Sequence, residues 1–190
     1  DVSKFLNHYL NKDKIPIVTG FICKSKEDKI NTLGRGGSDL SATFLAKCIE
    51  ADNVQIWKDV DGLMSADPKK VPNAIPVPHV TYNEARELAY FGAKILHPVS
   101  MIPAIQSNIP VYIKNSYNPE HIGTVISEKN ENTNLVTAIT TKNNITLIDI
   151  VSSRMLAQYG FLSKVFKIFE EDEMSIDVIA SSEISISLTL

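Results

Sequence analysis

The glycine-rich stretch Leu33–Asp39 constrains this chain most, because a helical pattern of apolar residues follows it directly. Its glycines allow a sharp turn and a close approach of the backbone to a ligand. N–H groups at a helix start carry partial positive charge, and the Arg35 guanidinium suits a carboxylate or a phosphate. Asp39 would repel such an anion unless the ligand also carries a cation. The stretch therefore predicts a bound amino acid, or a phosphate with a balancing cation. A plain turn with Ser38 or Asp39 as the helix N-cap is the alternative.

The bulk composition argues against several classes of protein. The chain has 190 residues, of which 44% are hydrophobic and 22% charged, and this allows one large globular domain or two small ones. Its net charge of −3 comes from well-mixed charges without a basic stripe, so we expect no nucleic-acid partner. It contains no apolar run of membrane-spanning length, so we expect no membrane partner. Cys23 and Cys48 lack the spacing of a metal site, and we predict that both are reduced.

Residues 1–126 alternate between strand-like and helix-like patterns, which predicts an α/β domain with a mainly parallel sheet. The predicted strands are Ile15–Ile22, Val54–Trp57 and Pro110–Lys114, and the predicted helices are Leu40–Ile49, Tyr82–Phe91 and Pro98–Ser107. Residues 127–134 are polar, and we interpret them as a linker.

Residues 135–190 predict a second, smaller domain with the order βαββ. Its strands are Ile145–Val151, Ser175–Ala180 and Ile184–Leu190, and its helix starts near Gly160. This order is a split βαββαβ unit that lacks one helix and one strand. Because the chain starts at Asp1 and stops on an alternating strand, we expect the sequence to continue at both ends. A native terminal strand is the alternative.

Two further segments of the larger domain carry polar groups that suit a ligand. Lys58, Asp59 and Asp61 follow a predicted strand, where the lysine suits a phosphate and the carboxylates suit a ribose hydroxyl or a metal. A solvated turn is the alternative for this segment. Lys94 follows a helix-ending glycine and either places a charge in a cleft or lies along the surface. We interpret His97 as structural.

Two features of the smaller domain suit an amino acid. Gly160 at a helix start would leave N–H groups for a carboxylate, and Asp177 or Glu183 would pair with an ammonium group. Ordinary helix capping explains the same residues equally well.

Taken together, these segments resemble aspartate kinase, the enzyme that phosphorylates the side-chain carboxylate of aspartate. The resemblance covers residues 15–190 and is closest to lysine-sensitive monofunctional forms of plant-like or bacterial type. The motifs that carry it are Thr32–Asp39, Trp57–Gly62, Phe91–Pro98, Lys114–Ser116, Met155–Leu156, Tyr159–Leu162 and Val178–Glu183. It implies that residues 1–126 are the C-terminal part of an amino-acid-kinase α/β sandwich. Residues 135–190 would be an incomplete ACT regulatory domain of ferredoxin-like fold.

The resemblance also implies roles for single residues. Arg35 would bind the α-carboxylate of L-aspartate beside Gly36 and Ser38, and Asp39 would organise the reacting region. The implied catalytic residues are Asp39, Arg35 and Lys94. The implied ATP-binding residues are Lys58, Asp59, Gly62, Leu63, Met64, Lys69 and Lys94. Met64 and Lys69 stand where many relatives have Tyr and Arg, so a hydroxyl and a bidentate fork are lost there.

The implied reaction is direct in-line phosphoryl transfer from ATP with Mg²⁺, which opens the biosynthesis of lysine, threonine and methionine. Positioning and charge neutralisation would suffice, because the attacking carboxylate is already a nucleophile. The family's Lys-x-Gly-Gly-Thr-Ser segment is not in this sequence, so we expect the isolated chain to be inactive. Two alternatives remain: another amino-acid kinase, acting on glutamate or a nucleoside monophosphate, and a non-catalytic subunit that senses amino acids.

The ACT resemblance implies feedback inhibition by L-lysine, with S-adenosylmethionine as a second effector in plant-like members, at an interface of a homodimer. The implied effector residues are Met155, Gln158, Gly160, Phe161, Leu162, Ser175, Asp177, Ser182 and Glu183. The resemblance implies no metal-binding residues in this chain. It places the enzyme in the cytoplasm, or in the plastid stroma of a plant.

Overall fold

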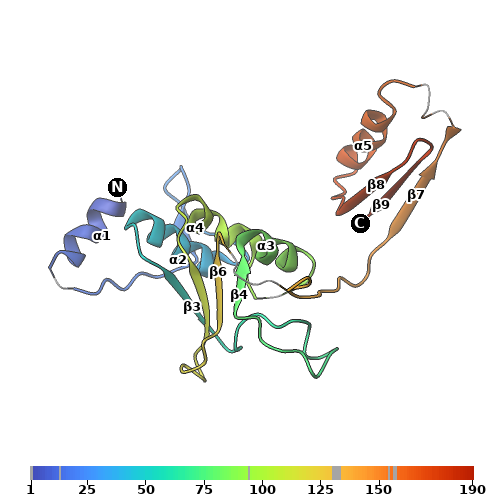
Figure 1. The fold of residues 1–190 in the computed structure, drawn as a ribbon. Helices are drawn as coiled ribbons and strands as arrows, with labels where there is room; N and C mark the ends of the chain where they lie inside the picture. The colour runs from blue at the N-terminus through green and yellow to red at the C-terminus, as the bar shows by residue number, and fades with distance from the viewer. Residues whose placement is uncertain (1, 13, 94, 130–133, 154, 156–157) are drawn as a thin grey trace. The chain divides into compact units, whose positions relative to one another are not determined.

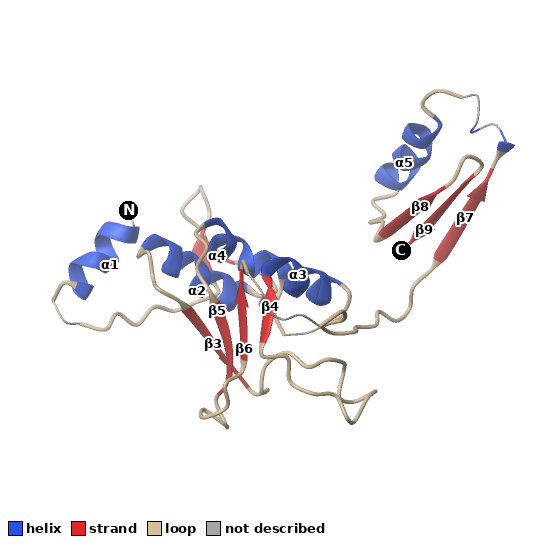
Figure 2. Cartoon of the chain, viewed as in Figure 1, coloured by secondary structure: helices blue, strands red, loops and turns tan. Residues whose placement is uncertain are grey.

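The computed structural model describes residues 2–12, 14–93, 95–129, 134–153, 155 and 158–190. The chain divides into two compact units, Asp1–Thr141 and Lys142–Leu190, and each is described by itself. Figure 1 follows the chain through its elements, and Figure 2 marks its helices and strands. Within the described residues, no helix is both long and apolar enough to cross a bilayer.

A four-stranded sheet forms the centre of the first unit. Its strands lie in the order β3-β5-β6-β4, with β3 at Val54–Lys58, β5 at Val111–Asn115, β6 at Thr124–Ser127 and β4 at His79–Thr81. The pairs β3–β5 and β4–β6 are parallel, as the predicted mainly parallel sheet requires, and the central pair β5–β6 is antiparallel. The connection from β5 to β6 is too short for the crossover that a parallel pair requires.

One face of this sheet carries the core of the first unit. Alternate residues of a strand point to the same face, and here Val54, Ile56, Val111, Ile113 and Ile126 are all buried. The helices that cover this face are α2 (Gly37–Cys48), α3 (Tyr82–Tyr90), the 3-10 turn η1 (Pro98–Met101) and α4 (Ile102–Gln106). The structure confirms the predicted strands near residues 54 and 110 and the three predicted helices, the third of which begins as η1.

Helix α3 begins at a capping box. Thr81 Oγ1 accepts a hydrogen bond from Glu84 N at 3.2 Å, and Glu84 Oε2 accepts one from Thr81 N at 2.7 Å. The next residue, Tyr82, donates its O–H to the Ile109 carbonyl at 2.7 Å. Burial, and secondly the charge of Glu128, raise the pKa of Tyr82 above its usual value. These contacts fix the first turn of α3.

The predicted buried strand Ile15–Ile22 is wrong. Ile15 and Ile17 are 91% and 97% exposed, and only the last residue of the segment lies in a strand. An apolar run forms a buried strand only where neighbouring strands bond to it, and no described strand pairs with residues 15–21.

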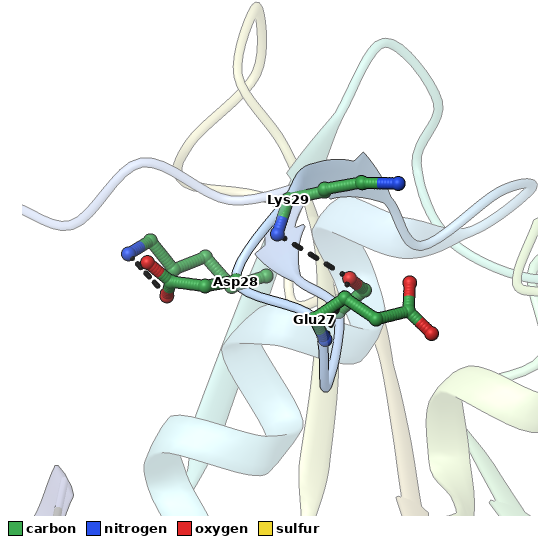
Figure 3. A network of polar contacts seen from close by, with 5 residues as sticks. Glu27, Asp28 and Lys29 are labelled. Atoms are coloured by element: carbon green, nitrogen blue, oxygen red, sulfur yellow. Dashed lines mark hydrogen bonds and ion pairs between the residues drawn. The ribbon is translucent and has the colours of Figure 1, made fainter.

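A short hairpin follows instead, after helix α1 (Val2–Leu10) and the exposed segment. It consists of β1 (Ile22–Lys24) and β2 (Ile30–Thr32). Figure 3 shows its turn, with Glu27, Asp28 and Lys29 labelled. Lys24 Nζ lies 2.7 Å from Asp28 Oδ1, and Lys29 N donates to Ser25 Oγ at 3.4 Å. Both charged side chains of this ion pair are exposed, so the pair stabilises the turn only weakly.

The second unit has the predicted βαββ order. Its elements are β7 (Leu147–Val151), α5 (Phe161–Glu171), β8 (Val178–Ser181) and β9 (Ser185–Thr189). The strands form an antiparallel sheet of order β7-β9-β8, and Val165 and Phe169 of α5 pack with Ile186 and Leu188 of β9. The structure confirms the three strands and the helix, with bounds shifted by up to three residues.

Residues 135–141 group with the first unit, although the sequence pattern places them at the start of the smaller domain. The predicted boundaries 1–126, 127–134 and 135–190 stay a prediction. Residues 130–133 of the predicted linker lie outside the described residues.

Candidate functional site

The glycine-rich stretch forms a turn that starts helix α2. Gly34 and Gly36 have φ values of 73° and 72°, in the left-handed region that favours glycine. Gly36 is the N-cap and no side chain caps the helix, so the predicted capping by Ser38 or Asp39 is wrong. Asp39 lies in the first turn instead, where a carboxylate interacts favourably with the helix dipole. Gly37 N donates to the Gly34 carbonyl at 3.0 Å, so the N–H groups of Ser38 and Asp39 are those that remain available to an anion.

The side chain of Arg35 lies exposed beside this turn. It makes no ion pair or hydrogen bond within the part of the chain that the structure describes. A guanidinium group in this state can form a bidentate contact with a carboxylate or a phosphate without first breaking another contact. Ser38 is also exposed, next to it in the first turn of α2.

His97 packs against the turn at Gly36. A Cβ built on Gly36 would lie only 2.5 Å from His97 Cβ, so this backbone approach requires glycine. His97 Nδ1 is buried and has no hydrogen-bond partner among the described residues. The interpretation of His97 as structural stays a prediction.

An ion pair joins the turn to the end of strand β3. Lys58 Nζ lies 3.0 Å from Asp39 Oδ2, and the two side chains are 25% and 18% exposed. The lysine cation offsets the repulsion that Asp39 would exert on an anionic ligand. The structure thus places a residue predicted to bind the amino acid next to a residue predicted to bind ATP.

Side chains from two parallel strands meet beyond their carboxyl ends. Lys58 and Asn115, the last residues of β3 and β5, are register partners. The Lys58 carbonyl accepts hydrogen bonds from Ser116 N and Ser116 Oγ, each at 2.8 Å. Asn115 Nδ2 donates to Asp61 Oδ1 at 2.8 Å. Ligands of open α/β sheets bind at this edge.

Asn115 and Ser116 were not assigned to the site from the sequence. The sequence does carry a signal for Asn115 and Ser116, because both directly follow a predicted strand. Lys58 and Asp59 are assigned to the site from the same pattern. The structure adds the reason for their importance, since both hold the backbone or a side chain of the neighbouring loop.

Thr124 fixes the loop that follows β3. Its buried hydroxyl accepts a hydrogen bond from Leu63 N at 2.7 Å and donates one to the Val77 carbonyl at 2.7 Å. Gly62 has a φ of 105°, and a Cβ there would lie 2.5 Å from Thr124 Oγ1. The close packing of Gly62 and Leu63 on Thr124 gives this loop one defined position.

The other predicted ATP-binding residues lie in or near this loop. Asp59 and Lys69 are exposed, and Met64 is half-buried and bridges to Pro76. Lys94, predicted both as catalytic and as ATP-binding, lies outside the described residues.

The acidic residues at the sheet edge do not form a closed metal cage. Among the described residues, no group of three or more His, Cys, Asp or Glu side chains could hold a metal ion. Asp59 and Asp61 are the carboxylates at the end of β3, and Asp61 already accepts a hydrogen bond from Asn115. One or two carboxylates suit Mg²⁺ that arrives with phosphate ligands, because Mg²⁺ keeps most of its ligands from phosphate and water.

A groove of about 500 Å³ lies in the second unit, at the N-terminus of α5 and the turn between β8 and β9. Most of the predicted effector residues line it, together with Tyr159. The lining residues are Met155, Gln158, Tyr159, Gly160, Phe161, Leu162, Ser182 and Glu183. Gly160 is the N-cap of α5, with no side-chain cap, so the first turn leaves N–H groups at the groove.

Ser175 and Asp177 lie at the other end of β8 from this groove. Five residue steps separate Asp177 from Ser182, about 16 Å along an extended chain. Asp177 forms an ion pair with Lys142, and its side chain is only 8% exposed. The predicted effector residues therefore form two groups, too far apart for one free amino acid to contact both within one copy of the unit.

Comparisons with known proteins find relatives along the whole chain. The chain is 52% identical over 189 residues to Aspartokinase 3, chloroplastic, of Arabidopsis thaliana, a match that covers 98% of this chain and 34% of that protein. It therefore spans about a third of the length of this curated relative.

Two solved structures of Escherichia coli aspartokinase III also match. The complex with aspartate and ADP (R-state) has a TM-score of 0.82 at 38% identity. The complex with lysine and aspartate (T-state) has a TM-score of 0.76 at 36% identity. Each match covers 100% of this chain and 44% of the solved chain.

A family model gives the assignment for the first unit. The model of the amino acid kinase family matches residues 2–115, more than half of the chain. The matched residues include the glycine-rich turn, the Lys58–Asp39 ion pair and the ends of β3 and β5. The chain therefore belongs to the amino acid kinase family.

Proposed function

We propose that the whole protein containing this chain is an aspartate kinase, which transfers a phosphoryl group from ATP to the side-chain carboxylate of L-aspartate. The Lys58–Asp39 ion pair carries this proposal, because it joins a turn suited to an amino acid to a sheet edge suited to a nucleotide. The similarity to a chloroplast aspartokinase, and to an aspartokinase solved with aspartate and ADP, supports it.

The glycine-rich turn holds the amino acid in this proposal. Arg35 binds the α-carboxylate of aspartate, helped by Gly36, Ser38 and the N–H groups of the first turn of α2. The α-ammonium group of the substrate balances the charge of Asp39. The catalytic residues are then Arg35, Asp39 and Lys94.

Lys58 connects the two substrates in this proposal. An ammonium group has three N–H donors, and the contact with Asp39 uses one of them, which leaves donors for a phosphate oxygen. The aspartate carboxylate needs no general base, so the protein acts by holding the reactants in line and by neutralising the charge of the phosphoryl group. The ATP-binding residues are those of the sheet edge and its loop: Lys58, Asp59, Gly62, Leu63, Met64, Lys69 and Lys94.

Mg²⁺ would be held chiefly by the ATP phosphates, with Asp59 as the exposed carboxylate at the end of β3. When bound, the ion neutralises negative charge on the phosphates.

A coupled assay of ADP release tests the proposal in the whole protein. L-Aspartate, L-glutamate and a nucleoside monophosphate are offered separately as acceptors with ATP and Mg²⁺. We expect turnover with aspartate alone. Turnover with another acceptor would indicate a different kinase of the same family. Binding of lysine in a calorimetric titration, without nucleotide binding and without turnover, would indicate an amino-acid sensor.

Replacement of Thr124 by valine is expected to raise the KM for ATP and to destabilise the first unit by about 2 kcal/mol. The change leaves the Leu63 N–H and the Val77 carbonyl buried without partners. Thr124→Ser keeps the hydroxyl and is expected to leave the KM for ATP near the wild-type value. Steady-state kinetics and urea denaturation of both variants measure the effects. Equal KM values for the valine and serine variants would contradict the role assigned to the hydroxyl.

The second unit binds a feedback inhibitor in this proposal, with L-lysine as its ligand. The similarity to an aspartokinase solved with lysine supports this choice. The two separate groups of effector residues suggest that a second copy completes the site, so that one copy supplies the groove and the other Asp177 with Ser175. The enzyme is then a homodimer through its ACT domains, and lysine acts by favouring one arrangement of the domains.

Two finer points belong to the same proposal. S-adenosylmethionine binds beside the lysine site, where Gln158 and Tyr159 line the groove. The enzyme works in the cytoplasm, or in the plastid stroma if the source is a plant, a location supported by the chloroplastic relative.

A further inference from the structure

The loop after β3, residues 59–64, contains most of the proposed ATP-binding residues and is tied to its neighbours near both ends. Before the loop, the Lys58 carbonyl accepts hydrogen bonds from Ser116 N and Ser116 Oγ, each at 2.8 Å. Near its far end, Leu63 N donates to the buried Thr124 hydroxyl at 2.7 Å. Ser116 directly follows β5 and Thr124 begins β6. The two ends of the loop are therefore held by the two ends of the β5–β6 connection.

Asp61 supplies a third point of attachment, in the middle of the loop. Its Oδ1 accepts a hydrogen bond from Asn115 Nδ2 at 2.8 Å and a longer one from Asn118 Nδ2 at 3.4 Å. Both donors are neutral amides, and Asp61 forms no ion pair within the part of the chain that the structure describes. The two contacts therefore fix the orientation of the carboxylate without cancelling its charge.

The side chain of Asn115 is itself held in one orientation. Asn115 is the last residue of β5 and is only 8% exposed. Its Oδ1 accepts a hydrogen bond from Tyr117 N at 2.9 Å, so the acceptor end of the amide faces its own backbone and the donor end faces Asp61. A buried amide with both ends bonded is a fixed support for the loop.

The exposed part of the loop lies between two of these attachments. Asp59 and Val60 are both exposed, and they separate Lys58, whose carbonyl is held, from Asp61, whose side chain is held. Two residues tied on both sides have few backbone conformations open to them. The Asn115–Asp61 hydrogen bond thus restricts where Asp59, the exposed carboxylate of the proposed ATP site, can lie.

We propose that Asn115 is a positioning residue of the nucleotide site, which acts through Asp61 to hold the loop after β3 in its ATP-binding arrangement. With the hydrogen bond intact, the loop is ordered before ATP arrives. Without it, the loop gains conformational freedom, and the binding of ATP must supply the cost of ordering it. This inference rests on the proposed function and adds to it a residue that lies outside the predicted ATP site.

Kinetics of the whole enzyme test the inference with Asn115→Asp, which keeps the shape of the side chain and sets a second carboxylate against Asp61. We expect the KM for ATP to rise about tenfold or more, because a charge-assisted hydrogen bond is replaced by repulsion. The kcat and the KM for aspartate should stay within about twofold, since the loss falls on the binding of one substrate. Asn115→Ala removes the donor without adding a charge. It should raise the KM for ATP about fivefold, and it serves as the test if Asn115→Asp does not fold.

Exchange of the two side chains separates positioning from a direct role of the Asp61 carboxylate. In the double variant Asn115→Asp, Asp61→Asn, the amide now at position 61 can donate to the carboxylate now at position 115, which still accepts from Tyr117 N. The KM for ATP should return to within about threefold of the wild-type value, a strongly non-additive result. If the carboxylate at position 61 itself bound ATP, the exchange would restore nothing.

Asn53→Asp is the matched control, because it makes the same change at an exposed asparagine directly before the other end of β3. It should change none of these constants. A wild-type KM for ATP in both Asn115→Asp and Asn115→Ala, with kinase activity intact, would overturn the inference and leave the proposed function standing. A double variant no better than the single variants at position 115 would also overturn it. Absence of aspartate phosphorylation in the wild-type enzyme would instead remove the proposed function.

Discussion

Replacement of Arg35 by alanine is expected to raise the KM for L-aspartate about 100-fold, while the KM for ATP changes less than about twofold. The guanidinium is exposed beside the first turn of α2 and has no other partner within the described residues. Its loss therefore affects the binding of the amino acid rather than the folded protein. Two charge-assisted hydrogen bonds to a carboxylate contribute several kcal/mol before competition with water, which corresponds to about this loss. Initial-rate kinetics with each substrate varied in turn measure both constants.

Arg86→Ala is the matched control, since Arg86 is an exposed arginine on α3 of the same unit. It should leave both constants unchanged. Arg35→Lys should recover only part of the loss, because an ammonium group cannot form the bidentate contact. A wild-type KM for aspartate in Arg35→Ala would show that the turn does not bind the amino acid through this side chain.

Replacement of Gly36 by alanine is expected to destabilise the first unit by about 3 kcal/mol and to raise the KM for aspartate at least tenfold. The residue has a φ of 72°, and the added Cβ would lie 2.5 Å from His97 Cβ. Left-handed strain accounts for about 1 kcal/mol and overpacking for about 2 kcal/mol. Relief of the clash moves the N-cap of α2, and with it the N–H groups proposed to bind the α-carboxylate. Urea denaturation of this chain, followed at its single tryptophan Trp57, measures the stability.

Gly34→Ala separates strain from crowding. Gly34 has nearly the same φ, 73°, but a Cβ there meets nothing within 4 Å. It should therefore destabilise the unit by about 1 kcal/mol, the strain contribution alone. Equal destabilisation by the two alanine variants would contradict the packing of His97 on Gly36.

The sequence predicts those elements whose pattern depends on local contacts. The helix after the glycine-rich turn, the strands near residues 54 and 110, and the βαββ order of the second unit all follow from apolar periodicity. The strand predicted at Ile15–Ile22 fails because burial of an apolar run depends on a partner strand, which local pattern does not contain. The short strands β4 and β6 were missed because three or four residues are too few to establish a period.

Much of the candidate site depends on contacts between residues far apart in the chain. The residue types at positions 39 and 58 indicated a ligand site, but nothing in the sequence indicates that these two side chains form an ion pair. The same holds for Thr124 on Leu63 and for Asn115 on Asp61. In each case the fold brings together residues that lie 19 or more positions apart in the chain. The grouping of effector residues at two ends of β8 likewise emerges only from the fold.

A crystal structure of the whole protein with L-aspartate and a non-hydrolysable ATP analogue tests the central claim most directly. We predict the α-carboxylate of aspartate on the Arg35 guanidinium, and a phosphate oxygen within hydrogen-bond distance of Lys58 Nζ. An amino acid bound elsewhere, with the Arg35 guanidinium directed into solvent, would contradict the claim.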